Sequence, residues 1–385
     1  MSKKIKRKDP MKGLIVLTVL LALLAAGTVV GGRMLSEYRA GLLAAQQEEV
    51  EERNARKQAE YNLALQEYQA EVAANQANKS WPEAAREGWD VIDLTNYPLE
   101  APGTETVSRS DIMFGGLLLV NEWHSRPGDF DESGILSLSS YARESGLDSF
   151  WADASRKLHT VAIDALIEAL KAAKEAGQEH YVVDYSYRTW DRQNEIFQEQ
   201  VEYYRRRYPN YSDERLIERA KTKVNYPGTS EFNSGLAFSL YLYESGNEEL
   251  RSTPFYETAQ GKWFYENSWK YGFVFRFPTV GYPYADTVDK TYKTGMSQSL
   301  NCYRYVGKGH AAVMNHLGLC LEEYVEYLQE HPHIAVFENG VKKYEITRQQ
   351  VGDDVATFTV DVNRMTNNYT MSLDNMGGVV TVYEY

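Results

Sequence analysis

The stretches that decide the fold are PGTSEFNSGLAFS at residues 227–239 and SLNCYRYVGKGHA at residues 299–311. Their polar residues with a side chain suited to metal ligation or proton transfer are Glu231, Asn233, Cys302 and His310. A catalytic zinc ion needs three protein donors, drawn from His nitrogen, Cys thiolate and carboxylate oxygen. His316 follows His310 by six residues, about 600° further round a helix, so these two imidazoles face different ways. The residues alone therefore predict no metal cluster.

Together with three further segments, the two stretches resemble the zinc D-alanyl-D-alanine carboxypeptidases, the VanY-like family that trims bacterial peptidoglycan. The further segments are LLLVNEWHSRPGDF at 117–130, DYSYRTWDRQNEIF at 184–197 and WFYENSWKYGFVFRFP at 263–278. After the last stretch, CLEEY at 320–324 is similar to the family's next helix. Any one of these segments would be a weak signal, but five in the family's order identify the chain as a member. The resemblance implies an α+β fold, in which a small antiparallel sheet is flanked by helices.

Four positions depart from the family's pattern, and they are the four that carry its chemistry. Where the family has His, Asp and His as zinc ligands and Glu as the catalytic base, this chain has, in the same order, Phe232, Ser239, Cys302 and Ser299. Phenylalanine has no lone pair, a neutral hydroxyl is a poor zinc ligand, and one thiolate is not a site. A serine at the base position cannot usefully take a proton from water at pH 7. We therefore expect a pseudoenzyme with no catalytic residues, no bound metal and no cofactor.

The resemblance also implies a binding cleft. In the family an arginine at the position of Arg188 faces the substrate's carboxylate, and its planar fork of donors suits that group. We expect the cleft to be lined as well by Tyr187, Gln193, Ser230 and Glu231. The expected ligand is a peptidoglycan stem peptide, or else a protein partner in the cell envelope.

Two alternatives remain open at this point. The chain could be an active peptidase, either with unforeseen metal ligands or with Cys302 as a thiol nucleophile and His310 as its base. It could instead be a structural scaffold. The simpler interpretation of Cys302 is a small buried residue that fills the former ligand pocket, and that of His310 is a packing residue at a helix start.

Charge and hydropathy predict a membrane anchor at the N-terminus. Residues 1–12 hold six Lys or Arg against one Asp, and residues 13–32 have no charged side chain. About 20 apolar residues are enough to span a bilayer. We expect an uncleaved, single-pass signal anchor at 13–32, with the basic tail in the cytoplasm and the rest outside the cell; a cleaved signal peptide is the rival interpretation. The net charge of −13 makes nucleic acid an unsuitable partner.

The remaining chain divides by composition. Residues 33–80 contain no Pro and are rich in Ala, Glu and Gln, which predicts a helical stalk. Its heptad pattern is broken, so a coiled-coil homodimer is a weaker interpretation than a solvated helix. The expected parts are a basic tail at 1–12, the anchor at 13–32, the stalk at 33–80, a linker at 81–112, the carboxypeptidase-like domain at 113–332 and a β extension at 333–385. The linker is expected to contain one strand, near 89–94.

Helices within the domain are expected at 151–176, 190–206, 212–222, 258–271 and 309–330. The two cysteines, Cys302 and Cys320, are too few for a disulfide framework, although they could pair with each other. Tyrosines and arginines gather at 203–211. Such a cluster could stack on sugar rings or hold acidic polymers, although a solvated helix end is the more common explanation.

Overall fold

The computed structural model of this chain describes residues 88–145, 147, 155–352 and 355–385, with eight further positions between 34 and 63. Those eight positions are helical, but most of the predicted stalk, including its heptads, lies outside the described residues. So do the basic tail and the anchor predicted at 13–32. Among the residues that the structure does describe, no helix has the length and apolar character that a membrane span requires. The chain forms two compact units, Met1–Glu60 and Tyr61–Tyr385, and the second holds the parts described below.

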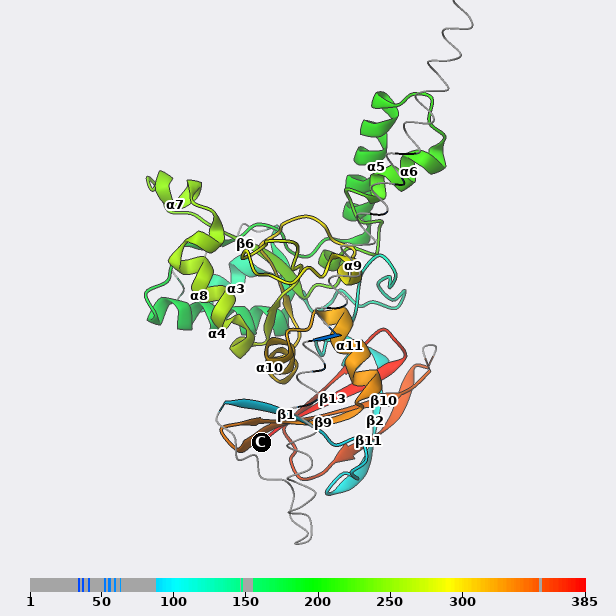
Figure 1. Cartoon of the computed structure of the whole chain (residues 1–385), viewed down its shortest axis with the longest axis vertical. Coiled ribbons are helices and arrows are strands. Elements are labelled where there is room, and N and C mark those ends of the chain that lie inside the picture. The colour runs from blue at the N-terminus through cyan, green and yellow to red at the C-terminus, as the bar shows by residue number, and fades with distance from the viewer. Residues whose placement is uncertain are drawn as a thin grey trace, which may run out of the picture. The chain divides into compact units, whose positions relative to one another are not determined.

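The predicted α+β fold is confirmed, and its centre is a four-stranded antiparallel sheet (Figure 1). In spatial order its strands are β5 (Tyr181–Val183), β6 (Ala237–Leu242), β8 (Cys302–Tyr305) and β7 (Phe273–Phe275). Aromatic side chains from the sheet and from neighbouring helices pack together on one side. Phe238, for example, is fully buried, with Phe273 at 5.2 Å between ring centroids. A separate two-stranded sheet joins β3 (Ile135–Ser137) and β4 (Lys157–His159).

Helices alternate with the strands along the chain. They are α3 (Leu138–Ser145), α4 (Thr160–Glu175), α5 (Trp190–Arg207), α6 (Asp213–Lys221), α7 (Glu248–Ser252), α8 (Ala259–Asn267), α9 (Thr291–Thr294), α10 (Lys308–Leu317) and α11 (Leu321–Glu330). Short 3₁₀ turns are η2 (Glu231–Asn233), η3 (Phe255–Glu257) and η4 (Ser268–Tyr271). Local sequence explains where several begin. The hydroxyl of Thr189 accepts a hydrogen bond from the amide of Arg192, which caps the first turn of α5.

The single helix predicted at 309–330 is wrong, because the chain breaks there into α10 and α11. Gly318 has a φ of 66° and ends α10 in the left-handed conformation that glycine adopts without strain. The carboxylate of Glu323 then accepts the backbone N–H of Cys320 at 3.0 Å, which helps to start α11. The helix predicted at 151–176 begins at Thr160 within the described residues.

The C-terminal residues form the predicted strands, in a five-stranded sheet of order β1-β9-β10-β13-β12. The strands are β1 (Trp89–Asp93), β9 (His333–Glu338), β10 (Val341–Gln350), β13 (Gly378–Glu384) and β12 (Tyr369–Leu373). The predicted turn at Asn339-Gly340 links β9 to β10, and its two residues have φ values of 50° and 79°, as a tight hairpin turn requires. β11 (Thr357–Asn363) pairs separately with β2 (Pro102–Ser108).

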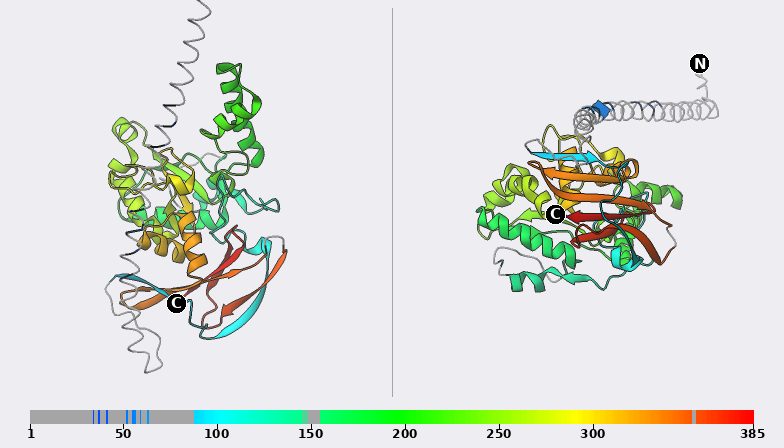
Figure 2. Two further views of the ribbon diagram at one scale, coloured as in Figure 1. Left: turned by 45° about the vertical axis from the view of Figure 1, so that its right-hand side comes forward. Right: turned by 90° about the horizontal axis from the view of Figure 1, so that it is seen from below.

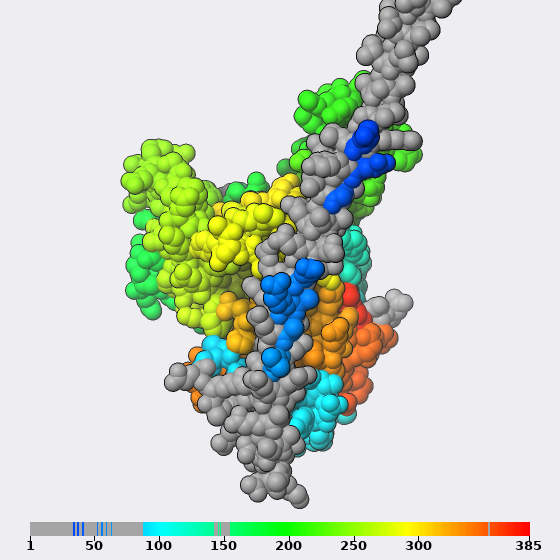
Figure 3. Space-filling view, viewed as in Figure 1, coloured from blue at the N-terminus to red at the C-terminus, as the bar shows by residue number. Residues whose placement is uncertain are grey.

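The segment 81–112, predicted as a linker, therefore supplies two strands to the C-terminal sheets. β1 is the strand expected near 89–94, whereas β2 and the short helix α2 (Arg109–Ile112) were not predicted. Figure 3 shows these early residues in cyan beside the orange and red C-terminal strands. One hydrophobic cluster joins the larger sheet to α10 and α11 through residues such as Ile346 and Leu321. The C-terminal strands thus share a core with the helices that precede them.

Candidate functional site

Three of the four positions that differ from the family's zinc and base residues lie close together in the structure. β6 and β8 are antiparallel neighbours, and their register places Ser239 directly opposite Cys302. Phe232 lies on η2, just before β6, and belongs to the same small hydrophobic cluster as Cys302 and Phe277. Ser299 lies in the loop before β8 and is exposed. The sequence thus placed three of these residues around one point, and the strand pairing explains why.

The donors at this point do not fit zinc. Phe232 is buried and contributes only a ring. The Ser239 hydroxyl already accepts a hydrogen bond from the backbone amide of Tyr185 at 2.9 Å. Cys302 is fully buried, and burial raises the pKa of its thiol, so the thiolate that would bind metal is disfavoured. Within the described ranges no three His, Cys, Asp or Glu side chains are grouped as a metal site would require.

The guanidinium of Arg188 lies over the ring of Phe232. Its Cζ is 4.9 Å from the centroid of the Phe232 ring and 5.0 Å from that of Tyr185. Its backbone amide donates to the carbonyl of Phe232 at 2.9 Å, which ties the two segments together. The side chain is half-buried, and burial lowers its pKa. A guanidinium packed against two aromatic rings keeps its N–H edge available for a planar anion.

The guanidinium of Arg188 has no carboxylate partner within 4.0 Å among the residues that the structure describes. Its one side-chain hydrogen bond goes to the Gln193 amide oxygen, at 3.3 Å. A half-buried arginine is usually paired, because removing a charge from water is costly. This unpaired donor edge is the feature of the site that points most directly to an anionic ligand.

Gln193 and Tyr187 lie beside Arg188, and their polar groups are bonded within the chain. Gln193 is almost fully buried, and its Nε2 donates to the carbonyl of Asn225 at 2.8 Å, so it orients Arg188 from behind. The Tyr187 hydroxyl accepts a hydrogen bond from Nη1 of Arg126 at 3.1 Å. Direct contact of either residue with a ligand stays a prediction.

Ser230 and Glu231 are more deeply buried than a cleft lining suggests, at 2% and 4% exposure. The Ser230 amide donates to Oδ1 of Asn233 at 3.3 Å, in a local turn. Glu231 Oε2 accepts from Nε of Arg276 at 2.6 Å, and Oε1 accepts from Nη1 of Arg304. Both oxygens of Glu231 therefore have partners, and the geometry gives this carboxylate a structural position rather than an open one.

The Glu231 contacts belong to a buried ion network that sequence reasoning missed. Arg276 also makes two bonds to Glu322, at 2.9 and 2.6 Å. Arg304 donates to the carbonyls of Gly116 and Leu118. Burial would raise the pKa of Glu231, but the charges of Arg304 and Arg276 outweigh it and hold the pKa below its usual value. The signal that could have revealed the network is an arginine within an otherwise apolar run, as in FVFRFP at 273–278.

The thiol alternative finds no support in the geometry of its two residues. His310 is buried, its Nδ1 lies 2.7 Å from the hydroxyl of Tyr324, and burial lowers its pKa to about 3. Cys302 contacts the Phe232 cluster instead. Cys302 and Cys320 are both free thiols, so the pairing considered from the sequence does not occur.

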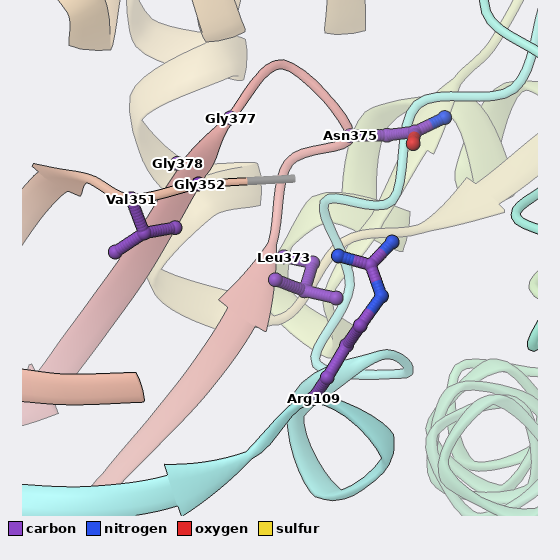
Figure 4. A pocket seen from close by; sticks show the side chains of 7 residues that line it. All are labelled: Arg109, Val351, Gly352, Leu373, Asn375, Gly377 and Gly378. Carbon is purple, nitrogen blue, oxygen red and sulfur yellow. The ribbon is translucent and has the colours of Figure 1, made fainter. Parts of the chain in front are cut away.

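Two cavities lie away from the departing positions. One of about 360 Å³ opens between α4, α10 and the strands β12 and β13. The other, drawn in Figure 4, lies where Arg109 approaches the loop around Asn375 and Gly377. Its volume of about 10 Å³ has room for roughly one water molecule. Phe232, Ser239, Ser299 and Cys302 line neither of these two cavities.

Comparison with known proteins supports the resemblance to the VanY-like family and the α+β fold. Residues 155–308 match the VanY family, described as D-alanyl-D-alanine carboxypeptidase. A D-alanyl-D-alanine carboxypeptidase of Enterococcus faecium is 29% identical over 306 residues, which cover 76% of this chain and 87% of that protein. The putative carboxypeptidase YodJ of Bacillus subtilis (strain 168) is 32% identical over 229 residues, covering 59% of this chain and 72% of that protein. The crystal structure of the vancomycin resistance D,D-dipeptidase VanXYg superposes with a TM-score of 0.53 at 21% identity, covering 74% of this chain and 99% of that one, which shows a shared fold.

Proposed function

This chain belongs to the family of VanY-like D-alanyl-D-alanine carboxypeptidases, and we propose that it is a member that binds peptidoglycan stem peptides without cleaving them. The ligand's terminal carboxylate would meet the unpaired edge of Arg188, held in place by Gln193 and by the rings of Tyr185 and Phe232. The observation that carries the proposal is this half-buried guanidinium without a carboxylate partner in the described structure.

The loss of catalysis is supported by the residues at the zinc and base positions. Phe232 offers no donor, the Ser239 hydroxyl is bonded to a backbone amide, and the Cys302 thiol is buried. Ser299 at the base position carries a hydroxyl in place of a carboxylate. Hydrolysis of an amide by this family's chemistry needs a metal-bound water and a base to take its proton. The side chains present supply neither part.

We also propose that the domain acts outside the cell, held at the membrane by residues 13–32. The proposal rests on the uninterrupted apolar run at 13–32 and the basic residues before it. A protein partner in the cell envelope that presents a free C-terminal carboxylate would use the same edge of Arg188. Such a partner is a second candidate ligand for this site.

The test uses the full chain, purified in detergent and loaded with zinc. Elemental analysis measures metal content, and release of D-alanine from a stem pentapeptide measures activity. We expect no stoichiometric zinc and no release. About one zinc per chain together with D-alanine release would establish the active alternative and overturn the pseudoenzyme.

Binding is tested by calorimetry with the same pentapeptide and the variant Arg188→Ala. A hydrogen bond to a charged group contributes about 1.5–3 kcal/mol, so we expect affinity to fall by about tenfold or more. Arg188→Lys keeps the charge but loses the planar fork, and should bind with intermediate affinity. Arg192→Ala is the matched control, because Arg192 lies four residues further along the chain, in the first turn of α5, and pairs with Glu195. Equal affinity in all four proteins, or no binding by the unmodified chain, would favour the scaffold alternative.

A further inference from the structure

The helices α5 and α6 pair as an arm that rises from the rest of the domain, as the views in Figures 1 and 2 show. Its interior is a small core of its own that contains Phe197, Val201 and Leu216. Near the far end of α5 this core continues as a row of tyrosines. Tyr204 lies 6.1 Å from Tyr208 between ring centroids, and Tyr208 stacks on Tyr211 at 4.9 Å.

Three arginines pack on this row of rings. Arg219 lies over both Tyr204 and Tyr208, at 5.2 and 4.6 Å from Cζ to the ring centroids. Arg215 lies over Tyr211 at 3.8 Å, and Arg207 approaches Tyr208 at 6.0 Å. All three arginines are exposed on the arm. The tyrosine row therefore gathers three guanidinium groups around one set of rings, which we call the arginine–tyrosine patch (Tyr204, Arg207, Tyr208, Tyr211, Arg215 and Arg219).

Several acidic residues of the arm are paired with other cations. Arg205 bonds to Glu202 and Asp213, and Lys221 bonds to Glu218. Within the described ranges no carboxylate oxygen lies within 4.0 Å of the guanidinium of Arg207, Arg215 or Arg219. The patch thus keeps three positive charges uncompensated on a chain whose net charge is −13.

The arrangement of the patch favours acidic polymers over sugar rings as its ligand. Sugar rings need an open aromatic face, but the rings of the patch are covered by one another and by guanidinium groups. What remains accessible is the N–H edge of each arginine, which matches an oxyanion. The pKa of the Tyr208 hydroxyl is lowered, by its hydrogen bond with Arg207 and by the charges of Arg219 and Arg207, which indicates positive potential at the same place.

We propose that the arginine–tyrosine patch binds a flexible polyanion that carries phosphate groups. A broad acidic surface, such as a membrane or an acidic protein, would approach the strongly acidic remainder of the chain as well and be repelled. A thin flexible chain can reach the arm alone, because the arm stands clear of the domain body (Figure 2). Phosphate suits the patch because its oxygens accept paired hydrogen bonds from a guanidinium fork. This surface is distinct from Arg188, so either proposal can fail while the other stands.

The experiment measures binding of fluorescently labelled inorganic polyphosphate to the full chain by anisotropy, at low and high salt. The variant is Arg207→Gln with Arg219→Gln, and circular dichroism confirms that helix content is kept. We expect affinity to fall by about tenfold at low salt, and the unmodified chain to lose most of its binding at about 1 M salt. A second variant, Arg207→Lys with Arg219→Lys, keeps the charge and should fall between the two.

The matched control is Arg192→Gln with Arg251→Gln, which removes the same charge from two paired arginines outside the patch. Full polyphosphate affinity in this control supports the proposal. An equal loss in the control and in the patch variant would mean non-specific attraction and overturn it. Equal binding of polyglutamate or of vesicles of phosphatidylglycerol would also overturn it, by assigning the patch to carboxylate chains or to a membrane surface.

Discussion

The guanidinium of Arg188 lies 4.9 Å above the ring of Phe232, at a position where the family resemblance leads one to expect a metal ligand. A fixed cation thus rests on an apolar side chain that holds no lone pair. The arrangement keeps a means of attracting a carboxylate while it removes the donor that zinc requires. Under the proposed function, recognition and hydrolysis, which share one cleft in a metallopeptidase, would be separate in this chain.

Replacing Glu231 with Gln should destabilise the fold. The change leaves Arg276 and Arg304 buried without the charge that both contact, and breaking a buried pair costs about 3–5 kcal/mol. Urea unfolding at pH 7 would report the loss as a lower midpoint. Glu195→Gln, in an exposed pair with Arg192, is the control and should leave the midpoint unchanged. Equal urea midpoints for both variants would mean that the buried ion network of Glu231 does not stabilise the fold.

Both thiols should resist modification in the native protein. Cys302 and Cys320 are buried, and burial raises the pKa of each. With Ellman's reagent at pH 8 we expect no rapid reaction, and then reaction of two thiols after unfolding in urea. Rapid reaction of one thiol in the native chain would instead revive Cys302 as a nucleophile.

Stability should fall as the pH is lowered from 7 to 5, in part because of His310. The folded pKa of about 3 lies below the unfolded value, so the unfolded chain takes up the proton first. With an unfolded pKa near 6.5, this site contributes a loss of about 2 kcal/mol between the two pH values. Carboxylates such as Glu345, with a pKa lowered to about 2, titrate below this window.

The measurement for His310 compares urea unfolding at pH 7 and pH 5. His310→Gln should reduce the difference by about 2 kcal/mol, and the share of His159, whose pKa burial lowers to about 4, remains. Tyr324→Phe removes the hydroxyl 2.7 Å from Nδ1 but keeps the imidazole, so its pH dependence should persist. The same pH dependence in His310→Gln as in the unmodified chain would assign the effect to other groups.

Adding one methyl group at Gly309 should separate α10 from the C-terminal sheet. A Cβ there would lie 2.8 Å from Cγ1 of Val382 and 3.0 Å from Cδ1 of Tyr344. Overpacking of this kind costs about 1–3 kcal/mol, which thermal unfolding of Gly309→Ala would measure. In Gly128→Ala the added atom meets nothing within 4 Å in the described structure, so stability should be unchanged or slightly higher.

Local patterns predicted much of the fold from the sequence. The turn at Asn339-Gly340 and the strands on either side of it follow from residue types that act over a few positions. The break at Gly318 was missed, because a helical apolar pattern continues across it and only the backbone conformation shows where α10 ends.

At the site, the motifs placed Arg188, Phe232 and Cys302 near one another, but not the partners of Glu231. Those partners lie 45 and 73 residues further along the chain, and no local signal joins them. Gln193, expected in the cleft lining, is buried and bonds to Arg188, a partner that the motif alone did not reveal. Sequence spacing shows which residues share a motif, whereas which of them remain open depends on packing between distant segments.

The pairing of β1 with β9 has a mechanical consequence. Tension applied through the residues before Trp89 reaches β1 first, at the edge of the five-stranded sheet, where the register from Trp89–Glu338 to Asp93–Ile334 resists it. β1 has only β9 as a hydrogen-bonded neighbour in its sheet, so its separation from β9 breaks no hydrogen bond of β6 or β8. A pull from the N-terminal side would thus break the β1–β9 hydrogen bonds before those of the central sheet, which carries Ser239 and Cys302.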